Sequence, residues 1–285
     1  MAEGKLMSKI PPIDSIRTTN LVEKFIKTRV AESKMKGVVF GVSGGIDSAL
    51  IASLSTRALG PKKVHAFFFP SITTPSEDLK DVKELCSVLK LNLTVIEIQD
   101  IIKAFSEAFG ETEKSSMNQW LNLKPRIRQS IWYFFANKLN CLVCGSSNKS
   151  ELMIGYYTKF GDGAADILPI GDLYKTHVYQ LGEFLKVPDP ILKKAPSAGL
   201  FKGQTDEAEI GMPYFELDRI LLGLELFGTD KEIAERLNIS STIVKRVRTM
   251  IYKSEHKRRG PIIFKLGVRT PTIDWRVPLV QPSKF

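Results

Sequence analysis

The chain has 285 residues, 43% of them hydrophobic and 25% charged, and a formal net charge of +10. No apolar run is long enough to span a bilayer, and the polar start, residues 1–12, lacks the apolar core of a signal peptide. Three cysteines are too few for a disulfide framework, so we expect a globular, cytoplasmic protein.

The basic charge suits an anionic partner such as nucleic acid, lipid or a small molecule. However, the lysines and arginines are scattered, with one dense run at residues 256–259. Scattered charge is typical of a solvated surface. We therefore expect neither nucleic acid nor a membrane as a partner.

Apolar spacing predicts strands that alternate with helices through the first 150 residues. Strands are predicted at residues 38–42, 64–69, 93–98 and 141–144, and helices at 19–34, 46–59, 75–89, 101–109 and 119–139. Thr74 is the expected N-cap of the helix at 75–89, and the polar stretch 111–116 is expected to be mobile. This alternation predicts an α/β fold with a Rossmann-like parallel sheet and helices on both faces.

The first predicted strand runs into the sequence S-G-G-I-D-S, residues 43–48. Gly44 and Gly45 let backbone N–H groups approach an anion, and the helix that begins near Ile46 adds its free N–H groups. Asp47 would repel a phosphate unless it binds an accompanying Mg²⁺. The motif resembles the pyrophosphate loop of ATP pyrophosphatases, whereas an ordinary glycine-rich turn is the simpler alternative.

Loops that follow three of the strands, at 43–48, 70–74 and 145–150, are expected to line one crevice, because ligands of parallel sheets bind beyond the carboxyl ends of the strands. Near the last of these loops, Cys141 and Cys144 form a C-x-x-C. Positions three apart in a strand point to opposite faces, so we expect two buried thiols that bind no metal and form no disulfide.

After residue 150 the sequence changes to loops and helices, predicted at 176–185, 213–226, 230–237 and 240–254. We expect one domain over 1–285, with an α/β core at about 19–186 and a C-terminal helical segment at about 187–285. The helices at 230–253 have the spacing of a DNA-binding helix-turn-helix, which leaves a DNA-binding protein as one alternative.

Residues 144–176 contain the remaining polar side chains that could bind a metal or a nucleotide. Glu151 offers a second carboxylate for Mg²⁺, and Lys159 and Lys175 lie near glycines, where they can reach phosphates. Ribose hydroxyls can donate hydrogen bonds to carboxylates such as Asp162, Asp166 and Asp172.

Over nearly its whole length the chain resembles the ammonia-dependent NAD synthetases. The matching stretches are S-G-G-I-D-S, N-L-K-P-R-I-R, G-S-S-N-K-S-E, Y-Y-T-K-F-G-D-G-A-A-D-I-L-P-I-G-D-L-Y-K-T, P-S-A-G-L-F-K-G-Q-T-D-E and S-E-H-K-R-R-G-P. The resemblance implies an adenine nucleotide alpha hydrolase-like fold. It also implies a reaction in which ATP activates the carboxylate of deamido-NAD as an adenylate, and ammonia then displaces AMP to give NAD.

The resemblance also assigns residues by their positions in these stretches. Asp47 and Lys175 are the implied catalytic residues, and Asp47 and Glu151 the implied Mg²⁺ ligands. The implied ATP-binding residues are Gly41, Val42, Ser43, Gly44, Gly45, Ile46, Asp47, Ser48, Ser146, Lys175 and Ser197. The implied deamido-NAD-binding residues are Arg126, Lys159, Asp166, His256 and Lys257, with Arg128 as an alternative to Arg126. In this family deamido-NAD lies near a subunit interface, which implies a homodimer.

Two positions depart from the family pattern. Ser146 replaces a common threonine and keeps its hydroxyl, whereas Gly199 replaces an aspartate whose role would be lost or taken by Asp206, Glu207 or Glu209. Residues 1–37 are too few for the amidase domain of glutamine-dependent relatives, so we expect free ammonia, or ammonia from a separate protein, as the substrate. Another pyrophosphate-loop enzyme that acts on tRNA is the second alternative.

Overall fold

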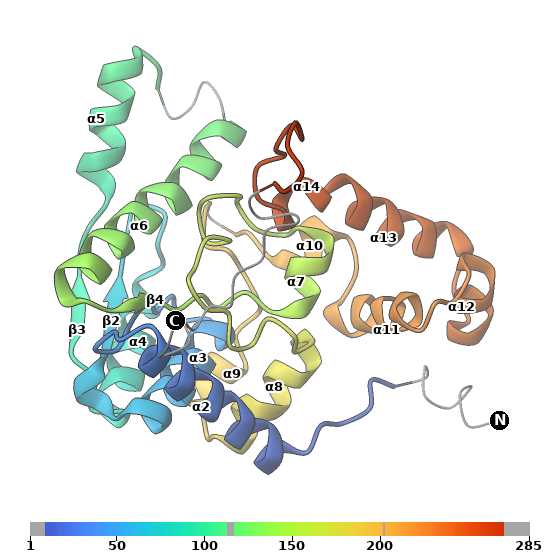
Figure 1. Cartoon of the computed structure of the whole chain (residues 1–285), viewed down its shortest axis with the longest axis horizontal. Helices are drawn as coiled ribbons and strands as arrows, with labels where there is room; N and C mark the ends of the chain where they lie inside the picture. Colours follow the sequence, from blue (N-terminus) through green and yellow to red (C-terminus); the bar gives the residue numbers. More distant parts are fainter. Residues whose placement is uncertain (1–8, 113–116, 202, 271–285) are drawn as a thin grey trace.

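The structure, a computed structural model, describes residues 9–112, 117–201 and 203–270 (Figure 1). Its centre is a four-stranded parallel sheet in the order β3-β2-β1-β4. The strands are β1 (Val38–Gly41), β2 (Val64–Phe68), β3 (Leu93–Val95) and β4 (Leu142–Val143). The predicted α/β fold with a parallel sheet is therefore confirmed.

Alternate residues of β1 and β2 enter two different hydrophobic cores, as the two-residue period of a strand requires. Val38 and Phe40 lie in the core on one face, whereas Val39 and Phe67 lie in the core on the other. The first face is covered by α2 (Ser15–Glu32), α3 (Ile46–Leu59), α4 (Ser76–Val88) and α8 (Lys175–Phe184). The second face is covered by α5 (Gln99–Phe109) and α6 (Met117–Leu139).

The C-terminal helices form a third hydrophobic core at one side of the molecule (Figure 1). They are α11 (Tyr214–Glu225), α12 (Asp230–Leu237) and α13 (Ser241–Lys253). The short α7 (Lys149–Ile154), α9 (Asp189–Leu192) and α10 (Asp206–Ile210) precede them in the chain, and α14 (Glu255–Arg258) follows. Apolar side chains of α12 and α13, such as Ile233 and Val247, are fully buried. They pack α12 and α13 against α11 and α7.

Most predicted elements agree with the structure to within a few residues, and α3 and α12 agree at both ends. One local prediction is wrong: Thr74 does not cap α4, whose N-cap is Pro75 without a side-chain bond. The Thr74 hydroxyl instead accepts a hydrogen bond from the N–H of Ser71 at 2.9 Å, which closes the turn before the helix. Residues 113–116 of the polar stretch lie outside the described residues. No described helix is long and apolar enough to cross a membrane.

Cys141 and Cys144 flank β4 and behave as the strand geometry predicts. Cys141 lies in the core beneath α6, Cys144 lies in the core beneath α3, and both thiols are free and buried. Burial raises the pKa of the Cys144 thiol to about 12 and also raises that of Cys141. Both thiols therefore stay protonated near neutral pH, which does not favour a metal site.

Replacing both cysteines with serine should lower the free energy of unfolding by about 1–3 kcal/mol per site, because each buried position then holds a more polar hydroxyl. Cys86→Ser is the matched control, since Cys86 is also buried and free. Urea unfolding of the native chain should not change when a reducing agent is added. If the urea midpoint of unfolding depended on reductant, and this dependence disappeared only when Cys141 and Cys144 were both replaced, the two thiols would be redox-active.

Candidate active site

The carboxyl ends of the parallel strands open into a cavity of about 1230 Å³. Its lining includes residues from all three loops expected there, namely 43–48 after β1, 72–74 after β2 and 146–147 after β4. Later segments close the remaining sides, among them Tyr156–Thr158, Lys175, Pro196–Phe201 and Lys257. The predicted crevice is thus confirmed, and its volume is sufficient for large substrates.

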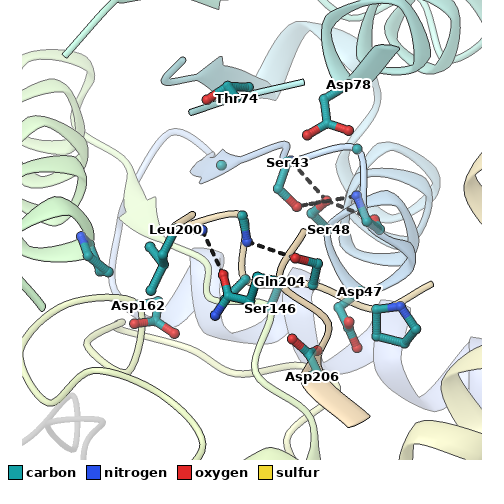
Figure 2. A pocket seen from close by; sticks show the side chains of 18 of the residues that line it. Ser43, Asp47, Ser48, Thr74, Asp78, Ser146, Asp162, Leu200, Gln204 and Asp206 are labelled. Carbon is teal, nitrogen blue, oxygen red and sulfur yellow. Dashed lines mark hydrogen bonds between the residues drawn. The ribbon is translucent and has the colours of Figure 1, made fainter. Parts of the chain in front are cut away.

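The loop after β1 has the geometry of an anion-binding turn. Gly44 adopts a φ of +80°, which favours glycine, and a Cβ on Gly41 would lie 2.0 Å from the Trp132 ring. The hydroxyl of Ser48 accepts a hydrogen bond from the N–H of Ser43 at 3.1 Å and donates one to the carbonyl of Gly45 at 2.9 Å (Figure 2). These bonds fix the loop, and the first residues of α3, whose N–H groups have no partner within the helix, line the cavity.

The ammonium group of Lys175 lies between two carboxylates at the floor of the cavity. Its Nζ donates to Asp47 Oδ2 at 2.5 Å and to Glu151 Oε1 at 3.2 Å, and Lys175 is only 1% exposed. Burial alone would lower the pKa of Lys175, but the charges of Asp47 and Glu151 raise it above its ordinary value. Burial raises the pKa of Glu151, and Lys175 opposes that shift. Lys175 is therefore a fixed cation at neutral pH.

Asn148 holds these two carboxylates in place. Its Nδ2 donates to Asp47 Oδ1 at 2.8 Å, and its Oδ1 accepts from the N–H of Glu151 at 3.0 Å. The Glu151 carboxylate bonds back to the N–H of Asn148, which completes a capping box at the start of α7. Asn148 is fully buried, so one side chain links the first turns of α3 and α7.

A third carboxylate, Asp206, extends the site toward α10. Tyr156 and Tyr214 donate hydroxyl hydrogen bonds to it at 3.1 and 3.2 Å, and Asp206 is buried. Burial raises the pKa of Asp206, while Lys175 and the two hydroxyls oppose that shift. Asp47 and Asp206 lie on one side of the site in Figure 2, and Asp162 lies on the other.

The donor set fits a hard divalent cation that also binds a ligand. Asp47 and Glu151 supply carboxylate oxygens around one point, which the Lys175 ammonium now contacts. Mg²⁺ commonly uses one or two carboxylates and takes its other ligands from phosphates and water. Among the described residues no cluster of three metal-binding side chains occurs, so the protein alone would not complete the coordination.

The segment after α9 covers the cavity and is anchored at several points. Lys194 forms ion pairs with Asp78 and Asp81 of α4. The carbonyl of Leu200 accepts hydrogen bonds from Thr73 at 3.4 Å and from the buried Lys124 at 3.2 Å. Between these anchors, Gly199 has a φ of +62°, which suits glycine better than the family's aspartate. Of the three acids expected as substitutes, Asp206 and Glu209 line the cavity and Glu207 does not.

Of the two predicted groups of site residues, the structure brings together the one assigned to ATP and the metal, and not the one assigned to deamido-NAD. All the residues predicted to bind ATP or the metal line the cavity, whereas only Lys257 of the second group does so. Arg126 is exposed and donates to the carbonyl of Lys159, whose ammonium in turn contacts the carbonyl of His256. Asp166 instead accepts from Tyr133 and from the N–H of Val143, beside β4.

The basic run at α14 has a structural role that the sequence did not indicate. Lys257 Nζ donates to the carbonyls of Gly155 and Tyr157, both at 2.7 Å. Arg258 donates to the carbonyls of Leu152 and Met153, at 3.0 and 2.7 Å. These cations satisfy the carbonyls at the C-terminal end of α7, where the helix dipole also favours positive charge.

Several site residues were not predicted, and the strength of their sequence signals differs. Asn148 could have been found, because N-K-S-E has the spacing of a capping box. Lys124 and the Asp78–Lys194 pair have no local signal, because their partners lie more than seventy positions away in the chain. Arg128 lines the cavity, whereas Arg126 does not.

Comparisons with known proteins agree with this geometry. Residues 18–261 match the family model described as NAD synthase. An NH(3)-dependent NAD(+) synthetase from Archaeoglobus fulgidus is 46% identical over 243 residues, which cover 85% of this chain and 94% of that one. Two solved structures each cover 89% of this chain and match along their full length: NMN synthetase from Francisella tularensis (34% identity, TM-score 0.80) and NH3-dependent NAD synthetase from Campylobacter jejuni (33%, 0.76).

Asn148→Ala should lower the free energy of unfolding by about 1–3 kcal/mol, because it removes a helix cap and one hydrogen bond to a buried carboxylate. Thr229→Ala is the control, since Thr229 forms the same capping box on the exposed start of α12. That variant should lose about 1 kcal/mol, the contribution of a cap alone. Urea unfolding of both variants measures the difference, and a loss at Asn148 no larger than that at Thr229 would contradict the role given to the Asp47 contact.

Proposed function

The chain belongs to the NAD synthase family, and we propose that its cavity carries out both half-reactions of that chemistry. The protein is a ligase that uses ATP to amidate deamido-NAD with ammonia, giving NAD. In the first half-reaction the nicotinate carboxylate attacks the α-phosphorus of ATP, and pyrophosphate leaves. Ammonia then attacks the carbonyl carbon of the adenylate, and AMP leaves as nicotinamide forms.

One observation carries this proposal, namely the Asp47–Lys175–Glu151 cluster beside an anion-binding turn in a large cavity. A carboxylate is a poor electrophile, and transfer of an adenylyl group gives its carbonyl a good leaving group. The enzyme must then hold two anionic substrates in line and neutralise charge on the departing pyrophosphate.

At the ATP end, we propose that residues 41–48 bind the triphosphate through backbone N–H groups and the Ser43 hydroxyl, while the Ser48 hydroxyl holds the loop in shape. Ser146 and Ser197 line the same cavity and would contact the nucleotide from β4 and from the covering segment. Lys175 is a cation rather than a base, because the neighbouring carboxylates raise its pKa. Its role would be to donate hydrogen bonds to phosphate oxygens as their charge grows.

Asp47 and Glu151 would hold Mg²⁺, whose contribution when bound is to neutralise and orient the phosphates. Their oxygens already converge on Lys175. If these two carboxylates hold the metal, Lys175 would donate its hydrogen bonds to phosphate oxygens instead. Asn148 would keep Asp47 and Glu151 in position for that role.

At the other end, we propose that Lys257 contacts deamido-NAD inside the cavity, while Arg126, Lys159, Asp166 and His256 contact it from the surface. The exposure of Arg126 and His256 is what a site completed by a second subunit requires, so a homodimer accompanies this proposal. We also propose a cytoplasmic location. The match of the family model to residues 18–261 favours this function over a tRNA-modifying or a DNA-binding protein.

The purified chain should convert deamido-NAD, ATP, Mg²⁺ and ammonium into equal amounts of NAD, AMP and pyrophosphate. Glutamine free of ammonia should not replace ammonium, because the curated relatives that match along 94–100% of their length are NH(3)-dependent. Chromatographic product analysis checks both statements. The appearance of ADP, or turnover with glutamine alone, would contradict the proposed reaction.

Asp47→Asn should reduce turnover by about a hundredfold or more, because asparagine keeps the size of the side chain but removes a metal-binding charge. Calorimetry should also show weaker binding of Mg²⁺ in the presence of ATP, while circular dichroism shows a folded protein. Asp230→Asn is the control, since Asp230 pairs with Arg248 away from the cavity. Unchanged Mg²⁺ affinity in the Asp47 variant would remove this residue from the metal site.

A further inference from the structure

Arg126 and Arg128 occupy the same helix but face different surroundings. Two positions along an α-helix are turned by about 200° around its axis, so only one of these side chains can face the cavity. Arg128 lines the cavity together with Pro125 and Trp132 of α6, whereas Arg126 is exposed and donates to the carbonyl of Lys159. The direction of α6 therefore places Arg128, and not Arg126, in the cavity of this chain.

The guanidinium group of Arg128 has no hydrogen bond or ion pair to any residue of 9–112, 117–201 or 203–270. It is nevertheless partly buried, and burial lowers its pKa while the charge of Asp162 opposes that shift. A guanidinium stays protonated in proteins and carries five N–H donors. The Arg128 nitrogens are not sealed from the cavity, so a partly buried cation without a hydrogen-bond partner among these residues is open to an anion that enters there.

The groups around Arg128 leave an excess of positive charge. The positive charges of Arg128 and Lys257 both act to lower the pKa of Asp162, against the effect of burial. All three residues line the cavity. The Asp162 carboxylate also accepts from the N–H of Thr158 at 2.9 Å, and Lys257 is held by two carbonyls. Two cations thus face one carboxylate, and Asp162 lies on the opposite side of the site from Asp47 (Figure 2).

We propose that Arg128 binds an anionic group of the nicotinate-bearing substrate, either its carboxylate or a phosphate, from the end of the cavity that faces away from the Asp47–Lys175–Glu151 cluster. This inference rests on the proposed function, because the triphosphate of ATP occupies the loop after β1. A planar guanidinium binds carboxylate and phosphate oxygens in pairs, which lysine cannot reproduce. Arg128 would therefore fix the substrate's orientation as well as attract it.

Arg128→Lys and Arg128→Ala test the proposal with steady-state kinetics and calorimetric binding. The alanine variant should raise the KM for deamido-NAD by about tenfold to a hundredfold, the size expected for lost charge-assisted hydrogen bonds, with little change in the KM for ATP. The lysine variant should recover only part of this loss, because it keeps the charge without the planar fork. Arg17→Lys, at an exposed position of α2, is the control and should behave as wild type.

Binding of the product distinguishes the two anionic groups, because NAD keeps the phosphates of deamido-NAD but has lost the carboxylate. Weaker binding of deamido-NAD alone would identify the carboxylate as the partner, and weaker binding of both would identify a phosphate. Either result supports the proposal. An unchanged KM for deamido-NAD, or an equal rise in the KM for ATP, would overturn it, and if the alanine variant does not fold the lysine variant decides.

Failure of this inference and failure of the proposed function are separable. Wild-type protein that forms no NAD from deamido-NAD, ATP and ammonium would contradict the function itself. Active wild-type protein with unaffected Arg128 variants would contradict only the role of Arg128.

Discussion

The buried ammonium group of Lys175, held between Asp47 and Glu151, is the interaction on which the arrangement of the site depends. Asp47 belongs to the first turn of α3, Glu151 to the first turn of α7, and Lys175 begins α8. Three helix N-termini from separate parts of the chain therefore meet at one point. The N–H of Lys175 also donates to the Ser150 hydroxyl, which contacts Asp218 of α11, so the C-terminal helices are tied to the same point.

Such a cluster is better explained by function than by stability. Removing charges from water is costly, and a buried ion pair often stabilises a fold no more than apolar residues of the same volume would. The cluster also concentrates the charges that phosphate chemistry requires. The two carboxylates hold the Lys175 ammonium, and that ammonium lies in the same cavity as the glycine-rich turn after β1. Asn148 keeps the geometry constant, because its amide group contacts both carboxylate-bearing turns.

The basic charge of the chain has a related explanation. Lys257 and Arg258 bind the carbonyls that end α7, so part of the dense run at 256–259 stabilises the helix that carries Glu151. The buried faces of α12 and α13 pack against α11 and α7 rather than standing as a separate module. A short helical pair and a basic run that resembled a DNA-binding unit thus support the wall of the cavity.

The sequence alone determined the parallel sheet, most helix boundaries and the residues of the loop after β1 that line the cavity. These features are local: β1, the Gly44–Gly45 turn and the start of α3 are consecutive, and the apolar period of a strand or helix is visible within one window. Even the opposite burial of Cys141 and Cys144 followed from strand geometry. The loops that end parallel strands meet at one edge, so their contribution to one cavity could also be predicted.

Only the tertiary structure decided which distant groups meet. The pairing of Lys194 with Asp78, the support of Leu200 by Lys124 and the inward direction of Arg128 depend on how segments far apart in the chain pack together. Spacing could not distinguish Arg128 from Arg126, because the direction of a helical side chain depends on the rotation of the whole helix against the sheet. That rotation is set by the packing of apolar residues such as Trp120 and Ile127 in the core, which no local pattern specifies.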